Sequence, residues 1–383
     1  MRRVPSETIM QVRNLKHPLL PTLTPDERSR QRAVVALRRV LNSELRPRNI
    51  DMYEQEGLPA FRARHGREPQ TQEEIEAAMF SSTGYRLWSA MNRSAQEMLW
   101  MAAGEPVLRD MERIEAHAQK LVNAPIKLGQ LQVDPAFEPP AEIAAVDIHL
   151  QPGGYALARH ADDVLAGALY ENGGNVYALG QGIGKGDSKA AAVIAHLGKI
   201  RPGFKPVRML EIGCSAGAAA CAYSAYYGTS EVHAIDLGAG MLRYAHARAE
   251  SLGVKVIFQQ MSGADLKFPD GTFDLVVSNN LLHEMGRESR RMMMREARRV
   301  LASGGIVIHQ DVPIRAAPSP VHQVERGWDA KFNGEIFWND YLDDDLSVDM
   351  RAAGFAASDI AEIRIEKIAG PGGWYLLTGE QRD

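Results

Sequence analysis

The strongest constraint on the fold is an alternation of apolar runs after Pro206. Five runs of strand length are separated by segments of helix length, and they read V-R-M-L-E-I, V-H-A-I-D, K-V-I-F-Q-Q, F-D-L-V-V-S-N and G-I-V-I-H-Q. Strands that alternate with helices are typical of crossover units, which build a mainly parallel sheet with helices on its faces. The C-terminal half is therefore expected to be an α/β domain.

The last two apolar runs are connected differently. A-E-I-R-I-E-K-I and G-W-Y-L-L-T-G are separated only by residues 369–372. Because a parallel crossover needs about a dozen residues or more, these two strands are expected to pair antiparallel. The prediction is a seven-stranded, mostly parallel sheet that ends in an antiparallel C-terminal hairpin.

The first 125 residues carry helix signals and almost no strand signal. The sequences T-P-D-E at Thr24 and T-Q-E-E at Thr71 place a capping hydroxyl three residues before a glutamate, which is typical of helix starts. Another helix is predicted over residues 106–122. We predict an all-α N-terminal domain over residues 1–125. One of its helices should bury a face with three-to-four spacing, formed by Leu87, Met91, Ala95, Met98 and Ala102.

The middle of the chain is harder to assign. Prolines over residues 123–152 indicate a linker or an extended crossing segment, and helices are expected over residues 156–169 and 188–199. The glycine-rich sequence between these helices lacks phosphate-loop spacing, because Lys185 is not followed by Ser or Thr, and is expected to be a flexible loop. We assign residues 126–200 to a linker with helical segments that contribute to the substrate site.

Composition excludes several classes of protein. The chain has 44 Lys and Arg against 48 Asp and Glu, with 24% charged and 45% hydrophobic residues, close to an average globular protein. A disordered chain or a nucleic-acid-binding protein is therefore not expected. Cys214 and Cys221 are too few for a disulfide framework, which favours a cytoplasmic location. No segment approaches the roughly 18 apolar residues of a membrane span, so no membrane partner is expected.

The most specific motif is M-L-E-I-G-C-S-A-G, which begins at Met209 between an expected strand and an expected helix. Its glycines allow the backbone to approach a ligand, and the amides at the helix start favour electron-rich groups. Asp236 follows Gly213 by 23 residues and ends the next strand, where a carboxylate can accept hydrogen bonds from a ribose diol. The pair predicts a nucleoside cofactor site.

With Met241-Leu242 and the run F-P-D-G-T-F-D-L-V from Phe268, this motif resembles the class I S-adenosylmethionine-dependent methyltransferases over residues 206 to 311. The resemblance implies a Rossmann-like fold for residues 201–383, S-adenosyl-L-methionine as cofactor, and in-line methyl transfer to a small-molecule acceptor. It also implies donor-binding roles for matching residues: Glu211 and Asn279 at the methionine, Gly213, Ser215 and Gly217 around the methionine and ribose, Asp236 on the ribose, and Leu237, Met241, Ser262 and Gly263 around the adenine. At position 262 the family often has an aspartate that accepts from the adenine amino group, and either Ser262 or Asp265 takes that role here.

Four polar residues are candidate catalytic residues. His283 and Glu284 follow the fourth strand at the carboxyl edge of the sheet, where such folds bind ligands. His283 acts either as a general base or as a structural residue at a helix start. His149 and Tyr155 either reach the donor and acceptor or belong to a surface turn. Asp147, His149 and His160 are possible ligand types but lack a defined metal-ligand spacing, so no metal site is predicted.

Residues 313–341 read as a long irregular segment rich in aromatic side chains. A loop of this length in a compact fold is usually functional, so it either covers the acceptor or packs on the helical domain.

Three functions remain open at this point. In the first, a methyltransferase, the helical part caps the acceptor, forms a homodimer surface, or does both. The second is a nicotinamide-dependent oxidoreductase, although the G-x-G-x-x-G pyrophosphate motif is absent because alanines follow Gly217. The third is a non-catalytic protein that binds S-adenosylmethionine or assembles with partners.

Overall fold

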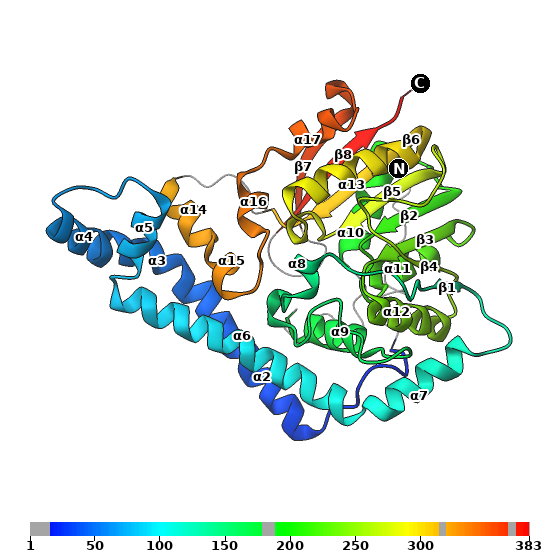
Figure 1. The fold of residues 1–383 in the computed structure, drawn as a ribbon, viewed down its shortest axis with the longest axis horizontal. Helices are drawn as coiled ribbons and strands as arrows, with labels where there is room; N and C mark the ends of the chain where they lie inside the picture. Colours follow the sequence, from blue (N-terminus) through cyan, green and yellow to red (C-terminus); the bar gives the residue numbers. More distant parts are fainter. Residues whose placement is uncertain (1–15, 178–187, 314–318, 367–372, 383) are drawn as a thin grey trace.

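A mixed eight-stranded sheet with helices packed around it forms the C-terminal half (Figure 1). The computed structural model describes residues 16–177, 188–313, 319–366 and 373–382. Of the loop predicted over residues 172–186, residues 178–186 lie outside them, but residues 172–177 belong to the helix α9 (Leu165–Tyr177), so the prediction of a loop is wrong there. The strand order is β1-β4-β3-β2-β5-β6-β8-β7. The strands are β1 (Gln130–Gln132), β2 (Arg208–Ile212), β3 (Glu231–Asp236), β4 (Ile257–Gln260), β5 (Phe273–Asn279), β6 (Leu301–Asp311), β7 (Ile360–Glu366) and β8 (Gly373–Glu380).

The predicted sheet class is confirmed. Strands β2 to β6 pair in parallel, whereas β8 runs antiparallel to both β6 and β7. The strand order reverses at β2, which has β3 on one side and β5 on the other. In open α/β sheets, ligands bind at the carboxyl ends of the strands beside such a switch point. The order therefore places the motif after β2 at the position where a ligand is expected.

The predicted number of strands is wrong by one, because β1 extends the sheet edge beyond β4. Its sequence is Q-L-Q, and only Leu131 packs on the core. A three-residue strand with two polar side chains has no detectable apolar period. It lies in the segment that was expected to be a linker or an extended crossing.

Helices make up most of the N-terminal part and also cover the sheet. They are α2 (Pro25–Arg39), α3 (Asn49–Met52), α4 (Leu58–His65), α5 (Gln72–Met79), α6 (Thr83–Arg109), α7 (Met111–Val122), α8 (Ala141–Ala144), α9 (Leu165–Tyr177), α10 (Ser188–Ile200), α11 (Ala218–Tyr227), α12 (Ala239–Leu252), α13 (Arg287–Val300), α14 (Pro320–Arg326), α15 (Trp328–Phe332), α16 (Trp338–Asp343) and α17 (Leu346–Ala352), with short turns η5 (Ile148–Leu150) and η6 (Leu282–Glu284) among the remaining helical turns. The capping box at Thr24 is confirmed.

The helix expected over residues 106–122 forms as α7 from Met111, but its predicted start is wrong, because Pro106 lies in the last turn of α6. A proline inside a helix leaves the carbonyl four residues earlier without its donor. That carbonyl belongs to Ala102, and the side-chain amide of Gln31 in α2 donates to it over 3.0 Å. The neighbouring helix therefore supplies the missing hydrogen bond, which local sequence patterns cannot show.

The predicted apolar face of α6 is also partly wrong. Ala95 and Ala102 are buried, but Leu87, Met91 and Met98 are among the exposed hydrophobic residues. The buried face of α6 instead includes Trp88 and Leu99, which lie on a different side of the helix from Leu87, Met91 and Met98.

The helix expected over residues 156–169 forms later in the chain, as α9. Asp163 sets its start, because its carboxylate accepts from the N–H of Leu165 over 2.9 Å and from the guanidinium of Arg159. An aspartate that accepts from a first-turn amide is a helix-start signal.

The aromatic segment over residues 313–341 is not irregular, since its described part forms α14, α15 and α16. Figure 1 shows α14 and α15 lying beside the N-terminal helices rather than beside the sheet. The indole N–H of Trp328 donates to Ser89 over 2.7 Å, and Arg46 forms ion pairs with Glu325 and Asp329. The α14 and α15 part of this segment thus packs on the helical part, whereas Phe337, which precedes α16, lines the cavity described below. In the residues that the structure describes, no helix is both long and apolar enough to cross a membrane.

Candidate active site

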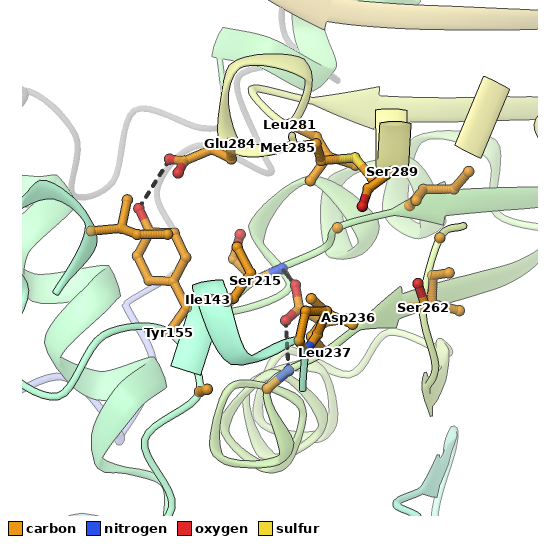
Figure 2. A pocket seen from close by; sticks show the side chains of 18 of the residues that line it. Ile143, Tyr155, Ser215, Asp236, Leu237, Ser262, Leu281, Glu284, Met285 and Ser289 are labelled. Atoms are coloured by element: carbon orange, nitrogen blue, oxygen red, sulfur yellow. Dashed lines mark hydrogen bonds between the residues drawn. The ribbon is translucent and has the colours of Figure 1, made fainter. Parts of the chain in front are cut away.

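A cavity of about 940 Å³, its open mouth included, lies at the carboxyl ends of β2, β3, β4 and β5. Its walls come from the loops after these strands, from residues 140–156 and from residues 281–289 (Figure 2). The cavity thus joins the predicted cofactor motif to two of the predicted catalytic residues, Tyr155 and Glu284.

Backbone groups build one end of the cavity, which we call the donor end and define by residues 213–217 and 236–238. Gly213 and Gly217 have φ angles of 71° and 75°, and Ser215 has 46°. These left-handed conformations favour glycine. A Cβ atom on Gly213 would also lie 2.7 Å from Leu281 Cδ1. The glycine at 213 is therefore required by both its φ angle and the available space.

Asp236 is fixed by two backbone amides of the donor end. The N–H of Ser215 donates to Oδ2 over 2.8 Å, and the N–H of Gly238 donates to Oδ1 over 2.9 Å (Figure 2). Burial raises the pKa of Asp236, although these amide hydrogen bonds act in the opposite direction. The carboxyl group is thus held rigidly at the cavity wall, with capacity to accept further hydrogen bonds.

The predicted donor-binding residues divide into two groups. The first group lines the cavity and consists of Gly213, Ser215, Asp236, Leu237, Ser262 and Gly263. Glu211, Gly217, Met241 and Asn279 are not part of the lining; Glu211 and Met241 are only 1% exposed. The side-chain amide of Asn279 donates to Glu211 over 2.8 Å. Asn280, which follows it with a φ angle of 53°, does line the cavity.

Side chains build the opposite end of the cavity, which we call the acceptor end and define by Tyr155, Glu284 and Phe337. The hydroxyl of Tyr155 donates to Glu284 Oε1 over 3.2 Å, as Figure 2 shows. Phe337 precedes α16 and adds an aromatic wall. Two of the four predicted catalytic residues therefore face the cavity.

The other two, His149 and His283, lie behind Glu284 and outside the lining. His149 Nε2 is 3.1 Å from Glu284 Oε1, and its Nδ1 is 2.8 Å from Glu335 Oε1. His283 Nε2 is 3.6 Å from Glu284 Oε1, and its Nδ1 is 2.5 Å from Asp311 Oδ1. Sequence positions far apart thus meet in one network, and His149 does not belong to a simple surface turn.

The network perturbs the acidity of its members. Burial alone would lower the pKa of His283, but the charge of Asp311 outweighs it and raises the value to about 9. Burial opposes protonation of His149 as well, yet Glu335 and Glu284 raise its pKa. Burial would raise the pKa of Glu284, whereas His149 and His283 lower it. The pKa of Tyr155 is raised, chiefly by burial and in addition by the negative charge of Glu284.

Comparison with known proteins identifies the part of the chain that carries the donor end. Residues 209–305 match the methyltransferase domain family. The phosphatidylethanolamine N-methyltransferase of Cereibacter sphaeroides is 30% identical over 147 residues, which are 38% of this chain and 69% of that protein. The chain belongs to the S-adenosylmethionine-dependent methyltransferases. The match favours this methyltransferase assignment over the nicotinamide-dependent alternative.

Other methyltransferases also resemble this chain over part of its length. The ajmaline N-methyltransferase of Rauvolfia serpentina is 32% identical over 109 residues, which are 28% of this chain and 36% of that enzyme. The phosphoethanolamine N-methyltransferase 2 of Haemonchus contortus, solved with S-adenosyl-L-methionine, superposes with a TM-score of 0.39 at 15% identity, over 50% of this chain and 53% of that one. The chain spans 36%, 54% and 38% of the first three curated relatives it matches.

Three residues beyond the four predicted catalytic residues surround the acceptor end: Phe337, Asp311 and Glu335. Asp311 ends β6 at the carboxyl edge of the sheet, a position that could have placed it beside His283. Glu335 and Phe337 lie between α15 and α16 in the sequence N-G-E-I-F, which has no motif. Phe337 belongs to the aromatic segment for which covering the acceptor is one of the two predicted alternatives, whereas no sequence signal pointed to Glu335.

Proposed function

We propose that this chain transfers a methyl group from S-adenosyl-L-methionine to an oxygen or nitrogen atom of a small molecule. The observation that supports it is a single cavity whose donor end has the family's nucleoside-binding loop and whose acceptor end presents Glu284. Three relatives are named as N- or O-methyltransferases acting on ajmaline, on malonyl-acyl carrier protein and on phosphatidylethanolamine. These names favour an amine or hydroxyl acceptor.

At the donor end, the proposed role of Asp236 is to accept hydrogen bonds from the two ribose hydroxyls. Its two amide contacts with Ser215 and Gly238 hold the carboxyl group before any ligand arrives. A preorganised acceptor binds more tightly, because little ordering remains to be done upon binding. Leu237, Ser262 and Gly263 line the same end and are proposed to surround the adenine.

At the acceptor end, Glu284 is proposed to accept a hydrogen bond from the O–H or N–H of the substrate. Methyl transfer needs the attacking atom near the sulfonium methyl and in line with it, so positioning supplies much of the rate. Tyr155 fixes the carboxylate through its hydroxyl, while His149 and His283 contact the same oxygen from behind. We therefore regard Tyr155 and Glu284 as the groups that touch substrate, and the two histidines as positioning residues.

The helical N-terminal part is proposed to place the acceptor end. The carbonyl oxygen of His149 accepts from the indole N–H of Trp100 over 2.5 Å and from the amide of Gln96 over 2.7 Å, and both donors belong to α6. This contact joins residues 1–125 to the segment over residues 126–200 that carries His149 and Tyr155. The three-part domain division and a homodimer stay predictions, as does the cytoplasmic location.

Calorimetric titration of the full chain with S-adenosylhomocysteine tests the donor end. Asp236→Ala should weaken binding by about 1 to 3 kcal/mol, since hydrogen bonds to a charged group are lost. Asp270→Ala is the matched control, because this carboxylate is exposed, pairs with Arg299 and is not part of the cavity lining. Absence of binding by the folded wild-type chain would contradict the proposed donor site, and unchanged affinity in Asp236→Ala would remove Asp236 from it.

A further inference from the structure

Behind Glu284, imidazole nitrogens and carboxylate oxygens from separate segments meet at short range. His149 in η5, His283 in η6 and Glu335 between α15 and α16 each offer one ligand atom, and these atoms all lie within 4.8 Å of one another. We propose that His149, His283 and Glu335 bind a divalent transition-metal ion, with Glu284 as an adjacent oxygen ligand. The proposal departs from the sequence prediction of no metal site and does not depend on methyl transfer.

His283 is oriented in the way that metal-binding imidazoles usually are. Its Nδ1 contacts Asp311 at 2.5 Å, which leaves Nε2 facing the cluster. Asp311 is itself fixed, because its carboxylate accepts from the N–H groups of Leu282 over 2.8 Å and Val312 over 2.6 Å. A carboxylate behind one ring nitrogen sets the ring direction of a metal-ligating histidine and increases the basicity of the other nitrogen.

His149 is held in an unfavourable backbone conformation. Its φ angle is 54°, and the next residue, Leu150, has 61°. Left-handed conformations of non-glycine residues persist when the surroundings enforce them, and they are concentrated at functional sites. Here Trp100 and Gln96 of α6 hold the carbonyl of His149. The strained turn directs the imidazole between Glu284 and Glu335.

Glu335 supplies a second, independent observation that points to a cation. The residue is only 6% exposed, and its Oε2 is a buried oxygen without a hydrogen-bond partner among the described residues. Its other oxygen, Oε1, lies 2.8 Å from His149. A buried carboxylate oxygen without a donor is unfavourable, and coordination to a metal ion satisfies it.

The ligand set selects the class of metal. Imidazole nitrogens with carboxylate oxygens suit zinc, iron and other first-row transition ions, whereas magnesium and calcium prefer oxygen ligands alone. Zinc binds nitrogen and oxygen at about 2.0 Å, so tetrahedral ligand atoms lie about 3.3 Å apart. Glu284 Oε1 lies 3.1 Å from Nε2 of His149 and 3.6 Å from Nε2 of His283, distances close to that scale. Glu335 Oε1 faces the other ring nitrogen of His149, Nδ1, at 2.8 Å, so an ion held with Glu335 uses only one of the two nitrogens of His149.

A second cluster in the described residues provides a matched contrast. Glu115, His160 and Asp163 also bring three ligand atoms within 4.8 Å of one another. There, the guanidinium of Arg159 already donates to Glu115 over 2.8 Å and to Asp163 over 2.8 Å. A fixed cation among the carboxylates repels a metal ion. We therefore expect no metal at this second cluster.

The test is a titration of the chelator-treated full chain with Co²⁺, followed by calorimetry and visible absorption. We expect one ion per chain with the absorption bands of nitrogen-ligated Co²⁺, and competition by Zn²⁺. Glu335→Gln should lower the affinity at least about tenfold, whereas His160→Gln should leave it unchanged. Thermal unfolding of each variant shows whether the chain remains folded.

Several outcomes would overturn the proposal. These are absence of saturable Co²⁺ and Zn²⁺ binding by the folded wild-type chain, binding of Mg²⁺ alone, and loss of binding in His160→Gln but not in Glu335→Gln. Titration of the same samples with S-adenosylhomocysteine separates this proposal from the methyltransferase function. Donor binding without metal binding refutes only the metal site, and metal binding without donor binding refutes only the donor site.

Discussion

The two ends of the cavity differ in the groups that form them: backbone groups at the donor end and side chains at the acceptor end. The donor end uses backbone groups within residues 213–217 and 236–238, and its one fixed side chain, Asp236, is held by amides from the same two loops. The acceptor end uses side chains, and its central residue, Glu284, is contacted by Tyr155, His149 and His283. The donor end depends on short segments of sequence, whereas the acceptor end depends on how distant segments pack.

The largest expected effect is on the free energy of unfolding, and it comes from the contact between α9 and α12. Glu171 of α9 is contacted by His17, Arg248 and the hydroxyl of Tyr244, the last over 2.7 Å. Glu171→Gln should lower the free energy of unfolding by about 3 kcal/mol, because it removes the buried negative charge that His17, Arg248 and Tyr244 contact. Denaturant unfolding measures this. Glu68→Gln, in the exposed pair with Arg62, should change stability by less than about 0.5 kcal/mol.

The same carboxylate gives an acid dependence. Burial would raise the pKa of Glu171, but Arg248 and His17 lower it from 4.5 to about 2. A carboxyl with a lowered folded pKa stabilises the protein above its unfolded pKa, and this contribution is lost as the pH falls from about 4.5 to 2. Denaturant unfolding at several pH values should show a shallower acid loss in Glu171→Gln than in wild type. Equal slopes in both proteins would contradict the assignment.

The next effect tests the acceptor end directly. Glu284→Gln keeps the shape of the side chain but removes the charge that Tyr155 and His149 hold in place. Methyl transfer should fall about 100-fold, since misplacement of a reacting group by about 1 Å has an effect of this size. Affinity for S-adenosylhomocysteine should stay within about twofold of wild type. A parallel loss of donor affinity would show that the two ends are not separable.

The fold was predictable where local patterns and topology agree. The strand–helix alternation after Pro206 gave the parallel sheet, and the short link over residues 369–372 gave the antiparallel pair. Strand β1 was missed because Q-L-Q has no apolar period. The continuation of α6 through Pro106 was missed because its freed carbonyl is satisfied by Gln31, a residue of another helix.

The site divides in the same way. The donor loop was found because Gly213 and Asp236 follow strands at readable positions, and both line the cavity. His149 and Glu284 are both candidates from the sequence alone. They lie 135 positions apart in the chain, however, and no spacing rule predicts their contact. Glu335 had no signal, because nothing in its own sequence indicates that α15 and α16 bring it to His149.

A smaller effect tests the donor end. Gly213→Ala forces a left-handed conformation on alanine, at about 1 to 2 kcal/mol, and places its Cβ 2.7 Å from Leu281. We expect donor affinity to fall about tenfold by calorimetry. Gly228→Ala is the matched control, because Gly228 has a φ angle of 64° but no atom within 4 Å of an added Cβ. It should lose similar stability and keep donor affinity. An equal loss of donor affinity in both variants would mean that backbone strain alone lowers the affinity and that the contact of the added Cβ with Leu281 does not.

The smallest effect distinguishes placement of the acceptor end from general stability. Trp100→Phe removes the indole N–H that donates to the carbonyl of His149, and a lost hydrogen bond of this kind is worth about 1 kcal/mol. Trp328→Phe removes a comparable bond, from its indole to Ser89, in the same helical part. Both variants should lose similar stability in denaturant. Only Trp100→Phe should slow methyl transfer, several-fold and with unchanged donor affinity, because only that indole holds the strained turn that supports Glu284. Equal rates in the two variants would show that α6 stabilises the acceptor end without positioning it.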